Sequence, residues 1–134
     1  MKGEAPGRWP TPANAAAMRS RGGVSVVCVR GDGQVQETQS ISAGLDYPGI
    51  SSLHCFLKDT KRARYTSASD EEALKAYQLV SKLENISPSL EPSHAFAEAI
   101  KIAPKLSKDT IVIVNSCGDA KKDRDILKER LGKF

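Results

Sequence analysis

The chain has 134 residues, of which 40% are hydrophobic and 27% are charged, a composition typical of one soluble globular domain and not of a disordered chain. No apolar run approaches the roughly 20 residues of a membrane-spanning helix, and no apolar stretch follows the first charges as it would in a secretory signal. Of the 20 basic and 16 acidic side chains, residues 1–30 hold five and one, so this segment accounts for the whole net charge of +4.

Residues 1–22 are rich in glycine, proline, alanine and arginine and show no hydrophobic period. This composition predicts a basic, disordered leader ahead of a structured segment at 23–134. A basic tail can bind nucleic acid through the phosphate charge. Trp9 is its single aromatic residue and it has no basic helix face, so a solvated leader is favoured over a nucleic-acid site.

The three cysteines, Cys28, Cys55 and Cys117, are far apart and none belongs to a CxxC pair. This pattern indicates neither a disulfide framework nor a zinc site. A reducing cytoplasm is therefore the expected compartment.

The first half of the structured segment carries strand and turn signals. Residues 24–29 (VSVVCV) are β-branched and apolar, which predicts a buried strand. The Gly-Asp-Gly turn at 31–33 leads to residues 34–38, which can return as the second strand of a hairpin. Residues 40–52 are rich in serine, glycine and proline and are expected to form a long loop, which in a compact domain is usually functional or disordered. A short strand is expected at 64–67.

Two helices follow. Ser69 and Glu72 fit a capping box, which predicts a helix that runs to about Leu83 and closes at Asn85. Pro92 suits the first turn of a second helix that ends before Pro104. The expected buried positions are Ala73, Tyr77, Val80 and Leu83 on the first helix and Ala95, Phe96, Ala99 and Ile100 on the second.

The run TIVIV at 110–114 predicts a central parallel strand that is buried on both faces. A third, more polar helix is expected at 123–131. The order of elements gives an α/β fold in which helices pack on a small sheet.

Several blocks of this sequence point to one family. The most specific is SISAGLDYPG at 40–49, within a longer match that begins at Asp32. Three more blocks follow in the same order and spacing: residues 68–100, the strand TIVIVN at 110–115, and a remnant of the Gly-rich loop after it. Together, over about residues 31–125, they resemble the C-terminal third of the β-chain of tryptophan synthase.

The resemblance implies a fold-type-II pyridoxal-phosphate enzyme that condenses L-serine with indole to give L-tryptophan. The family's cofactor-binding lysine and its phosphate-binding Gly-Gly-Gly-Ser turn lie upstream of the matched blocks. Neither motif occurs in this sequence. We therefore expect a C-terminal fragment of the fold that does not catalyse the reaction alone.

Four positions acquire roles by resemblance. Asp46 matches the aspartate that helps to close the active site over the amino-acid intermediate, although a simple turn aspartate also fits. The backbone carbonyls of Tyr47 and Gly49 match positions that bind a monovalent cation. Glu91 matches a glutamate beside the cofactor ring, and a negative charge at the start of the Pro92 helix is favourable in its own right.

Cys117 and Gly118 match the loop that lines the cofactor ring. Cys117 stands where the family usually has the serine that hydrogen-bonds the pyridine nitrogen, and a thiol is a weaker partner. A small buried residue after a core strand is the alternative for Cys117. Gly118, Lys122 and Asp123 are the positions of this loop that keep the family pattern.

Three functional hypotheses follow. The chain can be a tryptophan synthase β-chain fragment that acts with an N-terminal β-chain fragment, a β-chain dimer partner or the tryptophan synthase α-chain. It can be a non-catalytic remnant or binding module that kept part of the fold. An unrelated basic α/β protein that binds nucleic acid is the third, and the density of the resemblance argues against it. Residues 1–23 do not resemble the family, which fits a frameshift or a misplaced start.

Overall fold

The computed structural model describes residues 15–20, 23–29, 32–38 and 40–132. Within these ranges no helix is long and apolar enough to cross a membrane. The elements are β1 (Ala15–Ser20), β2 (Gly23–Cys28), β3 (Gly49–Ser51), α1 (Ser52–Asp59), α2 (Asp70–Glu84), α3 (Leu90–Ile102) and α4 (Arg124–Leu131), with 3-10 turns η1 (Ala43–Leu45), η2 (Ala103–Lys105) and η3 (Ala120–Asp123).

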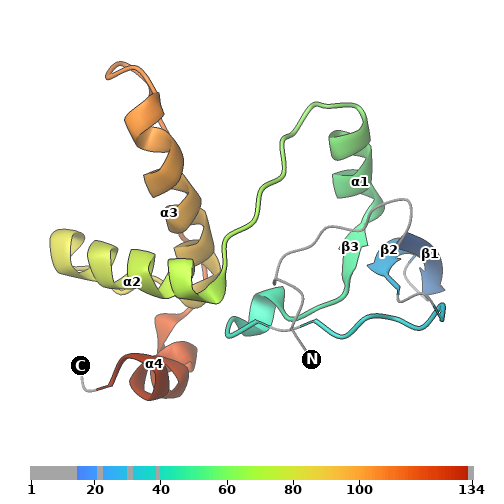
Figure 1. Ribbon diagram of the computed structural model, residues 1–134, viewed down its shortest axis with the longest axis horizontal. Coiled ribbons are helices and arrows are strands. Elements are labelled where there is room, and N and C mark those ends of the chain that lie inside the picture. Colours follow the sequence, from blue (N-terminus) through green and yellow to red (C-terminus); the bar gives the residue numbers. More distant parts are fainter. Residues whose placement is uncertain (1–14, 21–22, 30–31, 39, 133–134) are drawn as a thin grey trace.

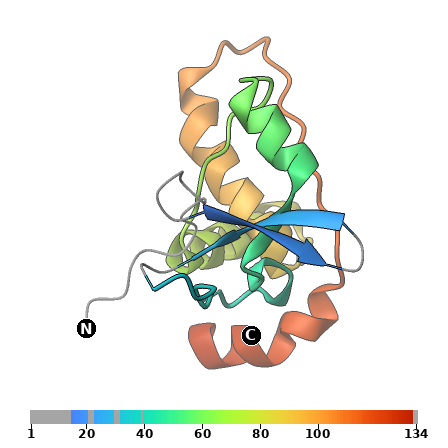
Figure 2. The same ribbon diagram turned by 90° about the vertical axis from the view of Figure 1, so that its right-hand side faces the viewer.

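The elements form two groups. Figure 1 shows the sheet with α1 on one side of the molecule and α2, α3 and α4 on the other, joined by an extended segment that leads from α1 to α2. Figure 2, seen from the sheet side, shows β1 and β2 as crossed arrows, with α1 and α3 rising above them and α4 below. The loop that carries η1 bridges the two groups, because η1 contacts α3.

The sheet is antiparallel with strand order β1-β2-β3. The strand predicted at 24–29 is confirmed as β2, but its main partner is β1. Among the described residues, those at 34–38 pair with it through one bridge, between Val29 and Val35. The prediction of a disordered leader is therefore wrong for residues 15–20, whose backbone pairs with that of β2. Residues 1–14 lie outside the described residues, and the division at residue 23 stays a prediction.

The predicted strands at 64–67 and 110–114 are wrong, because neither segment forms a strand in the structure. Ile111 and Ile113 are 86% and 89% exposed. A central parallel strand needs a neighbour on each edge and helices on both faces, and the described residues place none beside this segment. The predicted arrangement of helices on a parallel sheet is corrected accordingly: the helix that packs on β2 and β3 is α1.

The capping box at the start of α2 is confirmed. The Ser69 hydroxyl accepts the Glu72 amide and the Glu72 carboxylate accepts the Ser69 amide, so two N–H groups of the first turn have partners. Asn85 closes the helix in the left-handed conformation with φ of 54°, as predicted. Local signals therefore fix both ends of α2.

A small core joins α2, α3 and α4. Tyr77, Leu90 and Leu127 form its centre, with Ala73, Ala76, Val80 and Ala97 also buried. Ala73, Tyr77 and Val80 were predicted to be buried and are. The predicted stripe on α3 is wrong at Ala95 and Ile100, which are exposed, because α3 turns Ala97 and Ser93 inward instead. The prediction for Leu83, near the end of α2, is also wrong, since that side chain is exposed.

Candidate functional site

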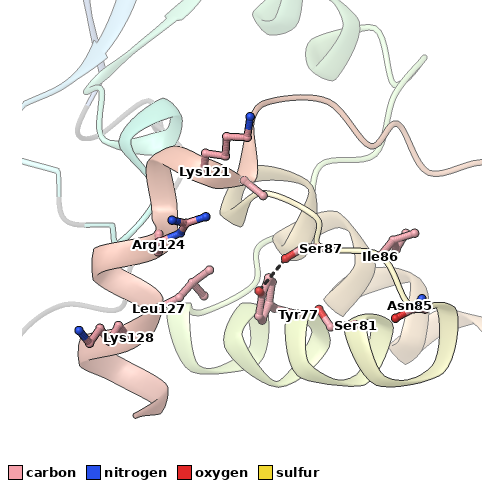
Figure 3. Close-up of a pocket in the computed structure, with 10 residues that line it drawn as sticks. Tyr77, Ser81, Asn85, Ile86, Ser87, Lys121, Arg124, Leu127 and Lys128 are labelled. Atoms are coloured by element: carbon pink, nitrogen blue, oxygen red, sulfur yellow. Dashed lines mark hydrogen bonds between the residues drawn. The ribbon is translucent and has the colours of Figure 1, made fainter. Parts of the chain in front are cut away.

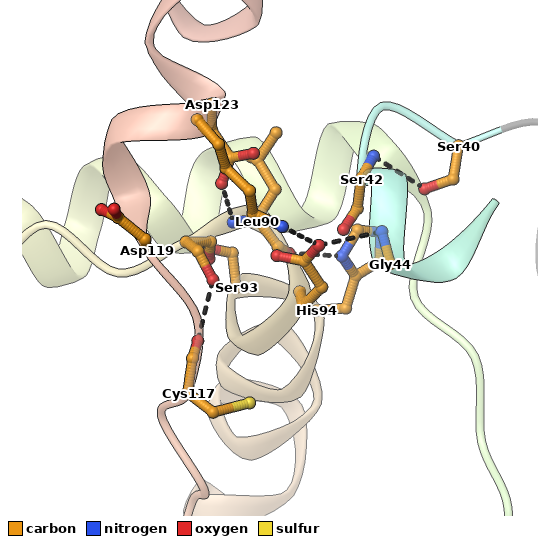
Figure 4. A network of polar contacts seen from close by, with 12 residues as sticks. Ser40, Ser42, Gly44, Leu90, Ser93, His94, Cys117, Asp119 and Asp123 are labelled. Carbon is orange, nitrogen blue, oxygen red and sulfur yellow. Dashed lines mark hydrogen bonds and ion pairs between the residues drawn. The ribbon is translucent and has the colours of Figure 1, made fainter.

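Three segments that are distant in the sequence meet at the N-terminus of α3. Figure 4 shows residues of η1 and the loop before it, residues at the start of α3, and the segment from Cys117 to Asp123 around one cluster of polar contacts. All three segments belong to blocks that carry the family resemblance. The loop predicted at 40–52 is confirmed only up to Pro48, with η1 inside it, because Gly49–Ser51 form β3 and α1 begins at Ser52.

Glu91 links the three segments through one oxygen. Its Oε1 accepts the Gly44 amide at 2.9 Å and is also bonded by the Lys122 ammonium group. Burial alone would raise the pKa of Glu91, but the hydrogen bond from Lys122 and the backbone N–H groups of Glu91 and Gly44 outweigh it and lower the pKa to about 2. The carboxylate is therefore ionised at neutral pH.

The second oxygen of Glu91, Oε2, is buried and has no hydrogen-bond partner among the described residues. A buried carboxylate oxygen without a donor is energetically unfavourable and is rare in folded proteins. The Ser89 side chain lies close enough to the carboxylate to help lower its pKa, and the chain's own atoms shield this oxygen from solvent.

Gly118 fits against this carboxylate because it has no side chain. Its φ is +93°, and a Cβ there would lie 2.5 Å from the Ser89 Oγ and 3.8 Å from the Glu91 Oε2. The Ser89 hydroxyl itself donates to the Cys117 carbonyl at 2.9 Å, which fixes the backbone of the loop on the start of α3. The site therefore requires glycine at 118 for both conformation and space.

Asp123 anchors the same loop. Its Oδ2 accepts the Leu90 amide at 2.7 Å, and the residue is 2% exposed. The amide belongs to the first turn of α3, where helix N–H groups have no partner within the helix. Lys122 and Asp123 are the two polar positions that keep the family pattern. Lys122 bonds Glu91, and Asp123 bonds the amide of Leu90, which precedes Glu91 in the chain. These contacts were not predicted from the sequence.

A second cluster of polar contacts, around Asp70 and His94, connects the 40–52 loop to α2 and α3. Asp70 accepts the Ser40 hydroxyl at 3.2 Å and the Ile41 amide at 3.3 Å. The His94 Nε2 lies 3.4 Å from the Asp70 Oδ1, and its Nδ1 is 2.8 Å from the Leu90 carbonyl oxygen. His94 therefore connects the two helices that hold the loop.

The remaining sequence-predicted positions lie around this cluster. Cys117 is exposed, so the alternative of a buried core residue is wrong. The Asp46 carboxylate accepts the Thr38 hydroxyl at 2.8 Å and is not among the contacts of Glu91. Tyr47 is 69% exposed and its ring lies over Gly49. In the part of the chain that the structure describes, no group of three or more His, Cys, Asp or Glu residues could hold a metal ion.

The comparisons with known proteins agree with the matched blocks. No family model matches the chain. It is 50% identical over 111 residues to a tryptophan synthase beta chain of Bordetella petrii, an alignment that covers 83% of this chain and 28% of that protein. It is 55% identical over 101 residues to that of Cereibacter sphaeroides, with 75% and 25% covered. This chain matches a C-terminal fragment of the tryptophan synthase β-chain family.

The tryptophan synthase β-chains are much longer than this chain. This chain spans about a quarter of the length of the relatives it matches. The homology fits the fold-type-II class of pyridoxal-phosphate enzymes. The Glu91 cluster and the exposed 110–114 segment both lie in the region that resembles the tryptophan synthase β-chain.

Proposed function

We propose that this chain supplies the C-terminal part of a tryptophan synthase β-like active site, which condenses L-serine with indole to L-tryptophan with pyridoxal phosphate as cofactor. The observation that carries the proposal is the Glu91 carboxylate. It is ionised, held by Lys122 and Gly44, and presents a buried oxygen that no described residue satisfies.

Glu91, Cys117 and Gly118 would contact one side of the pyridoxal-phosphate ring. Glu91 would lie beside the ring and accept a hydrogen bond from it, while Gly118 lets its loop pass close to Ser89 and the Glu91 carboxylate. The exposed Cys117 thiol would meet the pyridine nitrogen as a weak partner. When bound, pyridoxal phosphate supplies the electron-withdrawing ring that the chemistry at serine requires.

The other proposed roles follow the family. Asp46 would close the site over the amino acid, and its hydrogen bond to Thr38 holds it in a loop that is otherwise exposed. The carbonyls of Tyr47 and Gly49 would help to bind a monovalent cation. These positions lie within a few residues of Gly44, so closing of this loop would act directly on Glu91.

The cofactor-binding lysine and the phosphate-binding turn would come from residues outside this sequence. The proposed partners are therefore an N-terminal β-chain fragment, a second β-chain in a dimer, or the tryptophan synthase α-chain, all in the cytoplasm. The Glu91 cluster is the observation that favours a cofactor role over the alternative of a non-catalytic remnant or binding module.

The test is reconstitution with the upstream part of the Bordetella petrii tryptophan synthase β-chain, added as a separate fragment or fused to this chain. We expect tryptophan from serine and indole in the combined sample and none from either part alone. Borohydride reduction and mass mapping identify the lysine that carries the cofactor. A single pyridoxyl-lysine on the isolated chain together with turnover would contradict the proposal.

A further inference from the structure

A groove lies between α2 with the turn that follows it and the η3–α4 segment. It has a volume of about 700 Å³ and is lined by α2, the turn after it, η3 and α4. Figure 3 shows α4 along one wall and Tyr77, Ser81 and Ile86 on the other. None of the described residues that line it takes part in the Glu91 cluster.

The floor of the groove is apolar. Leu127 and Tyr77 are 3% and 5% exposed and belong to the core, and Ile86 at the rim is 49% exposed. The Tyr77 hydroxyl is hydrogen-bonded to the Ser87 hydroxyl at 2.8 Å, so the polar end of the ring is already satisfied. The floor therefore suits an apolar ring or short chain.

One wall of the groove is positively charged. Lys121, Arg124 and Lys128 are spaced by three and four residues along η3 and α4, a spacing that places side chains on one face of a helix. Among the described residues none of the three side chains has an ion-pair partner, and no acidic residue lines the groove. The Asp119 carboxylate accepts the Lys121 amide, so it caps the η3 turn.

A polar atom on the opposite wall also lacks a partner. The Ser81 Oγ is buried and has no hydrogen bond with any described residue. A serine within a helix usually bonds a carbonyl of the preceding turn or points to water. Here the Ser81 side chain lies on the wall opposite α4, so a ligand that displaces the atoms covering its hydroxyl gains a donor.

From the apolar floor, the unpaired cations and the unpaired hydroxyl, we propose that this groove binds a small organic anion: an apolar ring or short chain that carries a phosphate or carboxylate group. The floor holds the apolar part, Arg124 and Lys128 bind the charged group, and the Ser81 hydroxyl donates to it. The groove shares no residue with the Glu91 cluster.

Phenyl phosphate is the probe, titrated into the whole chain and followed by amide shifts in nuclear magnetic resonance spectra. Saturable shifts are expected at Ser81, Ser87 and Leu127. Phenol, which lacks the charge, and inorganic phosphate, which lacks the ring, should each bind several-fold more weakly. Equal affinity for phenol and phenyl phosphate, or shifts centred on residues 110–114, would overturn the proposal.

Two matched variants separate a built site from general charge attraction. Arg124→Gln with Lys128→Gln should weaken binding by roughly fivefold to thirtyfold, the loss expected for two partly exposed ion pairs. Lys75→Gln with Lys105→Gln removes the same charge from exposed positions elsewhere and should leave the affinity within twofold. Equal weakening in both variants would show that the groove is not the site.

Ser81→Ala tests the hydroxyl without a change in net charge. It should weaken phenyl phosphate binding and leave the melting temperature of the free chain unchanged or slightly higher, because the hydroxyl has no partner to lose. Unchanged affinity in this variant, with weakening in the Arg124 and Lys128 variant, would remove Ser81 from the site.

Discussion

Glu91 is the residue on which the candidate site depends, and its charge is stabilised by contacts from two other segments. Gly44 donates from the η1 turn and Lys122 from the loop before α4. The ion pair with Glu91 in turn raises the pKa of Lys122, and both groups are charged over the neutral range. The contact therefore holds the loop, the helix start and the 117–123 segment together.

The first prediction concerns the pH dependence of this contact. Because the pKa of Glu91 falls from 4.5 to about 2 on folding, its contribution to stability is full above pH 4.5 and is lost as the pH falls towards 2. Glu91→Gln should lower the free energy of unfolding at pH 7 by roughly 1–3 kcal/mol, with a deficit that shrinks over that window.

Urea unfolding at several pH values measures this difference. Glu71→Gln is the control, because Glu71 is an exposed acid in the first turn of α2. A deficit for Glu91→Gln that stays constant between pH 6 and pH 2.5 would show that the ion pair is not its cause.

The second prediction compares two glycines with similar backbone angles. Gly118 and Gly33 have φ of +93° and +80°, but only at Gly118 would a Cβ meet other atoms, the Ser89 Oγ at 2.5 Å. Gly33→Ala should cost about 1 kcal/mol from backbone strain alone, and Gly118→Ala about 2–4 kcal/mol, because Ser89 must break its bond to Cys117. Thermal unfolding of both variants checks this order, and equal costs would mean that the loop moves freely away from α3.

At the scale of elements, local signals determine what the sequence can predict. The ends of α2 were predictable because Ser69, Glu72 and Asn85 act within one helical turn. The 110–114 strand was not, because a strand forms only when other strands bond its edges, and hydrophobicity alone cannot supply them. β1 was not predicted from the sequence, because its residues AAAMRS have little preference for strands. This strand forms through its pairing with β2.

The third prediction follows from the exposure of that segment. Ile111→Ser with Ile113→Ser should change the free energy of unfolding by less than about 0.5 kcal/mol, because both side chains are already in water. Sedimentation velocity should show less self-association in this variant than in the wild type. Leu90→Ala, at a fully buried position, should cost about 2–5 kcal/mol and serves as the contrast. Marked destabilisation by the two serines would place the segment inside a core.

At the scale of the whole molecule, the core is small and the exposed apolar surface is large. Exposed large hydrophobic residues occur in α1, at the end of α2 and along 110–114, among them Leu53, Phe56, Leu83, Ile111 and Ile113. Large apolar side chains that gather on one surface are typical of interfaces with another part of a protein. This agrees with a chain that spans about a quarter of its relatives' length.

The candidate site was predictable in part at this scale. The resemblance pointed to Glu91, Cys117 and Gly118, and the structure brings these three positions together through Ser89 and the Glu91 carboxylate. The roles of Lys122 and Asp123 required the fold, because their partners lie 31 and 33 residues away in the sequence. Periodicity and local motifs carry no information on such pairs.

The most direct test of the central claim is cofactor retention in the reconstituted assembly. Pyridoxal phosphate absorbance after gel filtration should be retained with the wild-type chain and with Glu71→Gln. With Glu91→Gln, affinity should fall by about tenfold or more, since a hydrogen bond to a charged group contributes roughly 1.5–3 kcal/mol. Equal retention by the wild type and Glu91→Gln, or cofactor bound equally well by the upstream fragment alone, would contradict a cofactor site completed by Glu91.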